Sequence, residues 1–78
     1  MALVTQFTQI HKDSNRVHEG VECGYTVFES GGARYLQLDT YGSLGREFQG
    51  KVSQSIQLDA QAPTEVQRLI RHAYPELR

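Results

Sequence analysis

The stretches RYLQLDTY (residues 34–41) and KVSQSIQLD (residues 51–59) decide the fold, because apolar and polar residues alternate in both. Such alternation is typical of β-strands, whose successive side chains point to opposite faces of a sheet. One face is predicted to carry Leu36, Leu38, Thr40, Val52, Ile56 and Leu58. The other is predicted to carry Tyr35, Gln37, Asp39, Tyr41, Lys51, Ser53, Ser55 and Gln57. The apolar face must then be buried by another element, and the polar face is free to bind a ligand.

The residues before this region predict another strand. In residues 21–29, Val21, Cys23, Tyr25 and Val27 alternate with polar positions, and Phe28 is out of phase. The Gly-rich stretch 30–33 that follows is a strong signal of a hairpin turn. Residues 42–50 contain three glycines and link the second and third strands. Residues 3–10 are rich in β-formers and predict an edge strand or a loosely held arm, and residues 11–20 read as loop.

A helix is predicted after the last strand. Its apolar stripe has helical spacing and consists of Val66, Leu69, Ile70, Ala73 and Tyr74. Asp59 is one candidate N-cap; alternatively the helix begins at Pro63 with Ala62 as its cap. Pro75 ends it. The expected fold is α+β, an antiparallel three- to four-stranded sheet followed by one C-terminal helix packed on its apolar face. Residues 21–78 form this single β-β-β-α domain, and residues 1–20 form an N-terminal arm or edge strand and loop.

Length and charge limit the possible functions. A chain of 78 residues buries only a thin core, which favours a homodimer. The formal net charge of −1 argues against strong nonspecific binding to duplex DNA. A single cysteine cannot form an intrachain disulfide. Neither a secretory signal nor a run of about 20 apolar residues is present, so we expect a cytoplasmic protein without a membrane partner.

The motifs of catalysis and metal binding are missing. Gly50 and Lys51 lack the upstream glycine spacing of a phosphate-binding loop and enter a strand, so the glycine-rich segment is best interpreted as a hairpin loop. The three histidines and Cys23 contain no closely spaced ligand pair of the kind found in structural zinc sites. Ser43 does not sit in a nucleophile elbow. We therefore expect a noncatalytic protein with no metal and no cofactor, and a small enzyme is the least favoured alternative.

The polar face is the candidate binding surface. Tyr35 and Tyr41 can stack on unpaired bases, and Arg34, Arg46 and Lys51 can contact phosphates. Hydrogen bonds to the bases would come from Gln37, Ser53, Ser55 and Gln57. The expected function is therefore binding of single-stranded DNA or RNA. The alternatives are a solvated outer face without function and a protein-interaction or regulatory module that binds its partner by strand addition.

The sequence resembles a known family at the junction of the last strand and the helix. In the positive-cofactor type of transcriptional coactivator and its small bacterial relatives, a strand ending in Gly-Ile-Ser-Leu-Asn leads into one C-terminal helix. Residues 55–59, SIQLD, stand in that place here. The resemblance covers about residues 21–75 and implies a homodimer packed through its helices that binds single-stranded DNA, with Arg34, Tyr41, Arg46 and Lys51 at the contacts. The chain is also similar to short bacterial proteins that share residues 36–43 and 50–59, a similarity that implies no activity.

Overall fold

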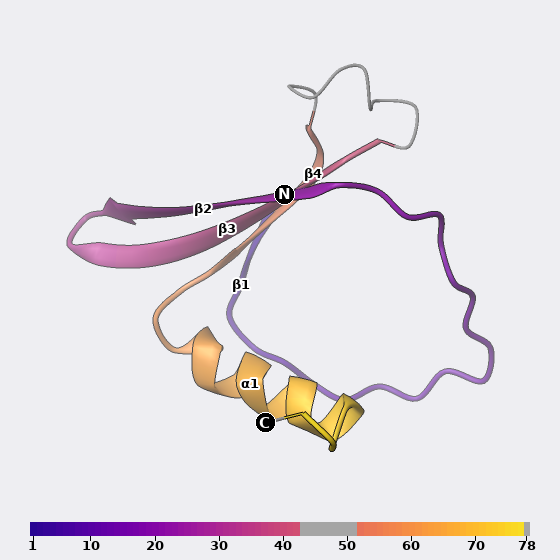
Figure 1. Ribbon diagram of the computed structural model, residues 1–78. Helices are drawn as coiled ribbons and strands as arrows, with labels where there is room; N and C mark the ends of the chain where they lie inside the picture. The colour runs from indigo at the N-terminus through magenta and orange to yellow at the C-terminus, as the bar shows by residue number, and fades with distance from the viewer. Residues whose placement is uncertain (43–51, 78) are drawn as a thin grey trace.

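The protein is a four-stranded sheet followed by one helix. The computed structural model describes residues 1–42 and 52–77 (Figure 1). The strands are β1 (Ala2–Val4), β2 (Cys23–Ser30), β3 (Ala33–Tyr41) and β4 (Val52–Leu58), and the helix is α1 (Ala62–Ala73). Their order across the sheet is β1-β4-β3-β2. The predicted α+β class, with a C-terminal helix after the sheet, is confirmed.

Strands β2 and β3 form the predicted hairpin. They pair antiparallel from Cys23 opposite Thr40 to Ser30 opposite Ala33. The two turn residues, Gly31 and Gly32, have φ angles of 60° and 84°. Two positive φ values in a two-residue loop suit the twist of the flanking strands, and glycine adopts them without strain.

Strands β3 and β4 also pair antiparallel, with Leu36 opposite Leu58 and Gln37 opposite Gln57. The register shifts near Thr40, so that Tyr41 lies opposite Val52. The prediction that Val52 shares the face of Ile56 and Leu58 is therefore wrong, because the irregularity interrupts the period of two. The alternation predicted for residues 54–58 is confirmed.

Strand β1 changes the character of the sheet. It pairs with β4 in parallel, with Ala2 opposite Ile56 and Val4 opposite Leu58. The sheet is therefore mixed, not wholly antiparallel as predicted. Only the first residues of the β-prone N-terminal segment form a strand, and residues 5–22 contain no regular helix or strand. In Figure 1 they run as a wide loop from β1 back to β2.

Helix α1 begins two residues later than a cap at Asp59 would place it. Gln61 occupies the N-cap position and makes no side-chain cap, and Pro63 lies in the first turn, where its missing N–H costs least. Asp59 instead accepts a hydrogen bond from the backbone N–H of Gln61, with 3.0 Å between nitrogen and Oδ1. The helix ends at Ala73, before Pro75 as predicted, and the N–H of the C-cap residue Tyr74 donates to the carbonyl of Ile70 at 2.8 Å.

The core is small, and α1 contributes one buried residue to it, Ala62 in the first turn. The buried apolar residues among those described are Leu58 and Ala62. Figure 1 shows α1 set apart from the β2–β3 hairpin. We call the residues that face the helix side of the sheet the apolar face; they are Cys23, Tyr25, Val27, Leu36, Leu38, Ile56 and Leu58. Much of it is open, and Cys23 is exposed.

Candidate functional site

The opposite side of the sheet, which we call the polar face, carries a row of hydrogen-bonded side chains. The register places Gln37 opposite Gln57 and Asp39 opposite Ser55. Gln57 Nε2 donates to Gln37 Oε1 at 2.8 Å, and Gln37 Nε2 donates to Asp39 Oδ1 at 3.0 Å. Ser55 Oγ donates to the same Asp39 oxygen at 2.5 Å. The four side chains form one continuous network across β3 and β4.

Burial assigns these residues different roles. The Ser55 side chain is buried, with 8% of the residue exposed, whereas Gln37, Asp39 and Gln57 are half-buried. Ser55 therefore has little exposed surface for a base, and its hydroxyl holds Asp39 in place; its contact with a base stays a prediction. Gln57 Nε2 has one further N–H, so this row can still donate a hydrogen bond to a ligand, whereas Gln37 Nε2 contacts both Asp39 oxygens, at 3.0 and 3.3 Å.

An aromatic pair extends the polar face toward the hairpin turn. Phe28 lies opposite Tyr35 in the β2–β3 register, and the two rings stack with 5.5 Å between centroids and 24° between planes. Both side chains are half-buried. Phe28 was not predicted as a site residue, because it only breaks the alternation of residues 21–29. That break indicates its place in the site, because it puts the ring on the polar face beside Tyr35.

Tyr41 is the third aromatic residue on this side. Its hydroxyl lies 3.1 Å from the point where a Cβ on Gly24 would be. Gly24 therefore provides space in β2 for the Tyr41 ring, which is half-buried. The polar face thus has Tyr35 and Phe28 toward one end and Tyr41 toward the other, with the amide row between.

Of the predicted cations, Arg34 lies in the part of the chain that the structure describes, and it is not on the polar face. Arg34 lies opposite Glu29 and alternates with Tyr35, so it belongs to the other side of the sheet. Its guanidinium contacts the Glu29 carboxylate, with 3.2 Å between Nη2 and Oε2. Arg46 and Lys51 lie outside the described residues. Ser53 is exposed, next to the register shift, and it has no part in the hydrogen-bonded row.

A shallow hollow of about 290 Å³ adjoins the amide row. It opens at the β1 side of the sheet and is lined by Met1, Ala2, Leu3, Gln37, Ser55 and Gln57. Apolar and amide groups therefore meet at one edge of the polar face. A planar group that carries hydrogen-bonding edges, such as a nucleobase, suits such a lining.

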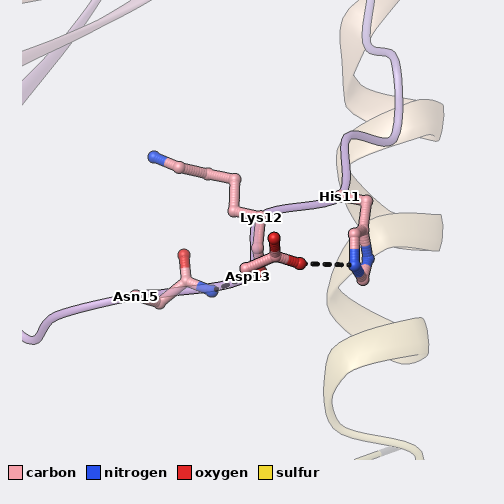
Figure 2. Close-up of polar contacts among 4 residues, drawn as sticks. All are labelled: His11, Lys12, Asp13 and Asn15. Atoms are coloured by element: carbon pink, nitrogen blue, oxygen red, sulfur yellow. Dashed lines mark hydrogen bonds and ion pairs between the residues drawn. The ribbon is translucent and has the colours of Figure 1, made fainter.

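The described residues contain no candidate metal site. In residues 1–42 and 52–77, no three His, Cys, Asp or Glu side chains gather closely enough to hold a metal ion. His11 contacts Asp13 at 3.2 Å in the exposed segment after β1, and the Asn15 amide donates to the Lys12 carbonyl at 3.4 Å (Figure 2). Both side chains of the His11–Asp13 pair are open to solvent. None of the helices described there is both long enough and apolar enough to span a membrane.

Comparison with known proteins adds no relative. No family model, curated protein or solved structure matches this chain.

Proposed function

We propose that the protein is a noncatalytic module that binds single-stranded nucleic acid on its polar face. The observation that carries this proposal is the Phe28–Tyr35 stack, which continues into the amide row of Gln37 and Gln57 on the same side of the sheet. Aromatic side chains bind unpaired bases by stacking, and amides meet the hydrogen-bonding edges of those bases.

The charges predict how such binding responds to salt. Asp39 is the ionisable carboxylate within the network, and it accepts hydrogen bonds from Gln37 and Ser55. Arg34 faces away from the ligand and contacts Glu29. Arg34 therefore adds little to the salt dependence, and stacking and hydrogen bonds supply the affinity of the described part of the polar face, while any phosphate contacts of Arg46 and Lys51 would add salt dependence.

Titration of a fluorescent single-stranded oligonucleotide at low salt tests the proposal. Tyr35→Leu removes the ring that stacks on Phe28, and we expect roughly 10-fold weaker binding, within the range measured for loss of one stacked base. Tyr35→Phe keeps the ring and serves as the matched control, with binding close to that of the wild type. Absence of binding at roughly 100 µM, the weak end of nonspecific nucleic-acid binding, would end the proposal.

The proposed module acts as a homodimer. Leu58 and Ala62, the buried apolar residues of the described chain, are too few to stabilise a sheet and a helix of this size. A second copy supplies the missing apolar contacts. Sedimentation at micromolar concentration checks this part separately from nucleic-acid binding.

Protein binding by strand addition is the second candidate function. Strand β2 lies at the end of the sheet order, and its eight residues pair with β3 on one side. A long edge strand presents unpaired backbone groups to an extended peptide. A protein ligand at this edge would bind equally well after Tyr35→Leu, which distinguishes the two candidates.

A further inference from the structure

Two apolar surfaces of the chain are exposed to solvent, although the spacing of their apolar residues is typical of buried surfaces. On the sheet, Tyr25, Val27 and Ile56 are 75%, 58% and 40% exposed. On α1, Leu69 and Ile70 are 41% and 45% exposed, and the only buried residue of the helix is Ala62. A helix with a continuous apolar stripe normally packs that stripe against a core.

The total surface is larger than that of a compact chain, and the exposed segment of residues 5–22 contributes to it together with the two apolar surfaces. The chain has an accessible surface of 7247 Å², whereas a compact monomer of 8.8 kDa is expected to have about 4800 Å². The excess is about 2400 Å² per chain. Obligate homodimers bury roughly 2000–5000 Å² over both partners, which is about 1000–2500 Å² from each chain, so the two apolar surfaces need to supply only part of this excess. The radius of gyration, 14.7 Å against about 11.5 Å for a compact domain of this length, agrees with this excess.

The residues that the structure describes do not close the gap between helix and sheet. Asp59 holds the turn before α1 through its carboxylate, which accepts from Gln61, and through its carbonyl, which accepts from the Ala62 N–H at 3.2 Å. These two bonds fix the direction in which the helix leaves β4. An open hollow of about 350 Å³ remains between Pro63 at the helix start and Val27, Leu36 and Leu58 on the sheet.

We infer that a second copy of this chain covers the apolar face, with α1 of each chain lying on the sheet of its partner. This arrangement deepens the proposed homodimer and does not depend on nucleic-acid binding. Each chain contributes one exposed helix stripe and one exposed sheet face. When the two chains exchange helices about a two-fold axis, all four surfaces are covered and no apolar surface is left for a third chain. The helix, about 18 Å long, matches the length of β4, about 23 Å.

The charges of α1 agree with this orientation. Glu65 accepts a hydrogen bond from Arg68, which raises the pKa of Arg68, and both charges stay off the stripe formed by Val66, Leu69 and Ile70. Arg71 lies on the side of the helix opposite the stripe. The centre of the apolar face likewise carries no charged side chain, since the Arg34–Glu29 pair lies at its hairpin end. Covering these surfaces therefore buries no unpaired charge.

Crosslinking between distinguishable copies tests the arrangement. In a Cys23→Ser background, one tagged chain carries Ile56→Cys and an untagged chain carries Leu69→Cys; the two are mixed and treated with a short bismaleimide. We expect efficient crosslinking of the tagged to the untagged chain. Arg71→Cys in place of Leu69→Cys is the matched control, and its crosslinking to Ile56→Cys should be several-fold lower.

Placing both cysteines in one chain distinguishes exchange from closure within a monomer. Exchange predicts a covalent dimer, whereas crosslinking within single chains would overturn the inference. Equal crosslinking by the Leu69→Cys and Arg71→Cys chains would overturn it too.

The mass in solution provides the second measurement. Sedimentation of the wild type should give twice 8.8 kDa at micromolar concentration, with a midpoint of thermal unfolding that rises with concentration. Leu69→Asp should weaken dimerisation about 30-fold or more, as for loss of a buried anchor, and Arg71→Asp should not. A folded wild-type monomer at this concentration would overturn both the homodimer and the exchange. A dimer in which crosslinks form only between two chains that both carry Leu69→Cys would overturn the exchange of helices but leave the homodimer standing.

Discussion

Ser55 donates a hydrogen bond to Asp39 across the β3–β4 pair, with 2.5 Å between Oγ and Oδ1. The two residues are direct register partners, so the backbone pairing places hydroxyl and carboxylate side by side. The same carboxylate accepts from Gln37, which in turn accepts from Gln57. The polar face is therefore ordered by its own side chains before any ligand arrives.

We expect Ser55→Ala to destabilise the fold. The substitution removes a buried donor to a half-buried carboxylate, and hydrogen bonds to charged groups contribute about 1.5–3 kcal/mol. The free energy of unfolding should fall by about 1.5 kcal/mol in urea titration. Ser53→Ala, two residues away on the same strand but exposed, is the control and should leave the midpoint nearly unchanged. Equal effects of the two changes would contradict the role given to Ser55.

The hairpin turn gives a second prediction. Gly31 has a φ of 60°, a conformation that costs most side chains about 1 kcal/mol, so Gly31→Ala should lower the free energy of unfolding by that amount. Gly31→Asn should cost less, because asparagine tolerates the left-handed region. Gly20→Ala is the control, since Gly20 lacks a positive φ and a Cβ there meets no atom within 4 Å. Chemical denaturation of the three variants ranks them.

The start of α1 gives a third prediction. Asp59→Ala leaves the Gln61 N–H without its partner and should lower the free energy of unfolding by about 1 kcal/mol, the usual effect of losing such a side-chain acceptor. Asp13→Ala also removes a carboxylate, but from an exposed pair with His11, and no change of the midpoint is expected. Should both variants melt alike, the Asp59 bond does not fix the turn.

Alternation in residues 34–41 and 54–58 was sufficient to predict the pairing of β3 with β4 and the two faces of the sheet. The Gly31–Gly32 turn was likewise predictable, because two consecutive glycines between alternating segments are typical of a hairpin turn. The parallel pairing of β1 was missed, since three residues carry no directional signal. The register shift at Thr40 was missed because it depends on the pairing of two strands and not on either alone.

The site was harder to predict than the fold. The polar face was located from the positions of Tyr35, Gln37 and Tyr41, but Asp39 was not recognised as the centre of a network. The cross-strand register decides which side chains form hydrogen bonds with one another, and the sequence of either strand alone does not determine that register. Arg34 was grouped with the site by composition, although its position next to Tyr35 places it on the other side of the sheet. Position along the strand was a better guide than residue type.

The charge of Asp39 gives the last prediction, which concerns binding. The carboxylate is half-buried on the polar face, within reach of any phosphate that lies along the amide row. Asp39→Asn removes this repulsion while keeping one oxygen to accept from Ser55 or Gln37. Affinity for a single-stranded oligonucleotide should therefore rise about 3-fold at low salt, and the gain should vanish near 1 M salt, where screening reduces the Debye length to about 3 Å. Asp13→Asn changes the net charge equally but lies on the exposed segment after β1, so it should give a smaller rise. If Asp39→Asn stays folded and binds no more tightly than Asp13→Asn at low salt, the ligand does not cross the amide row.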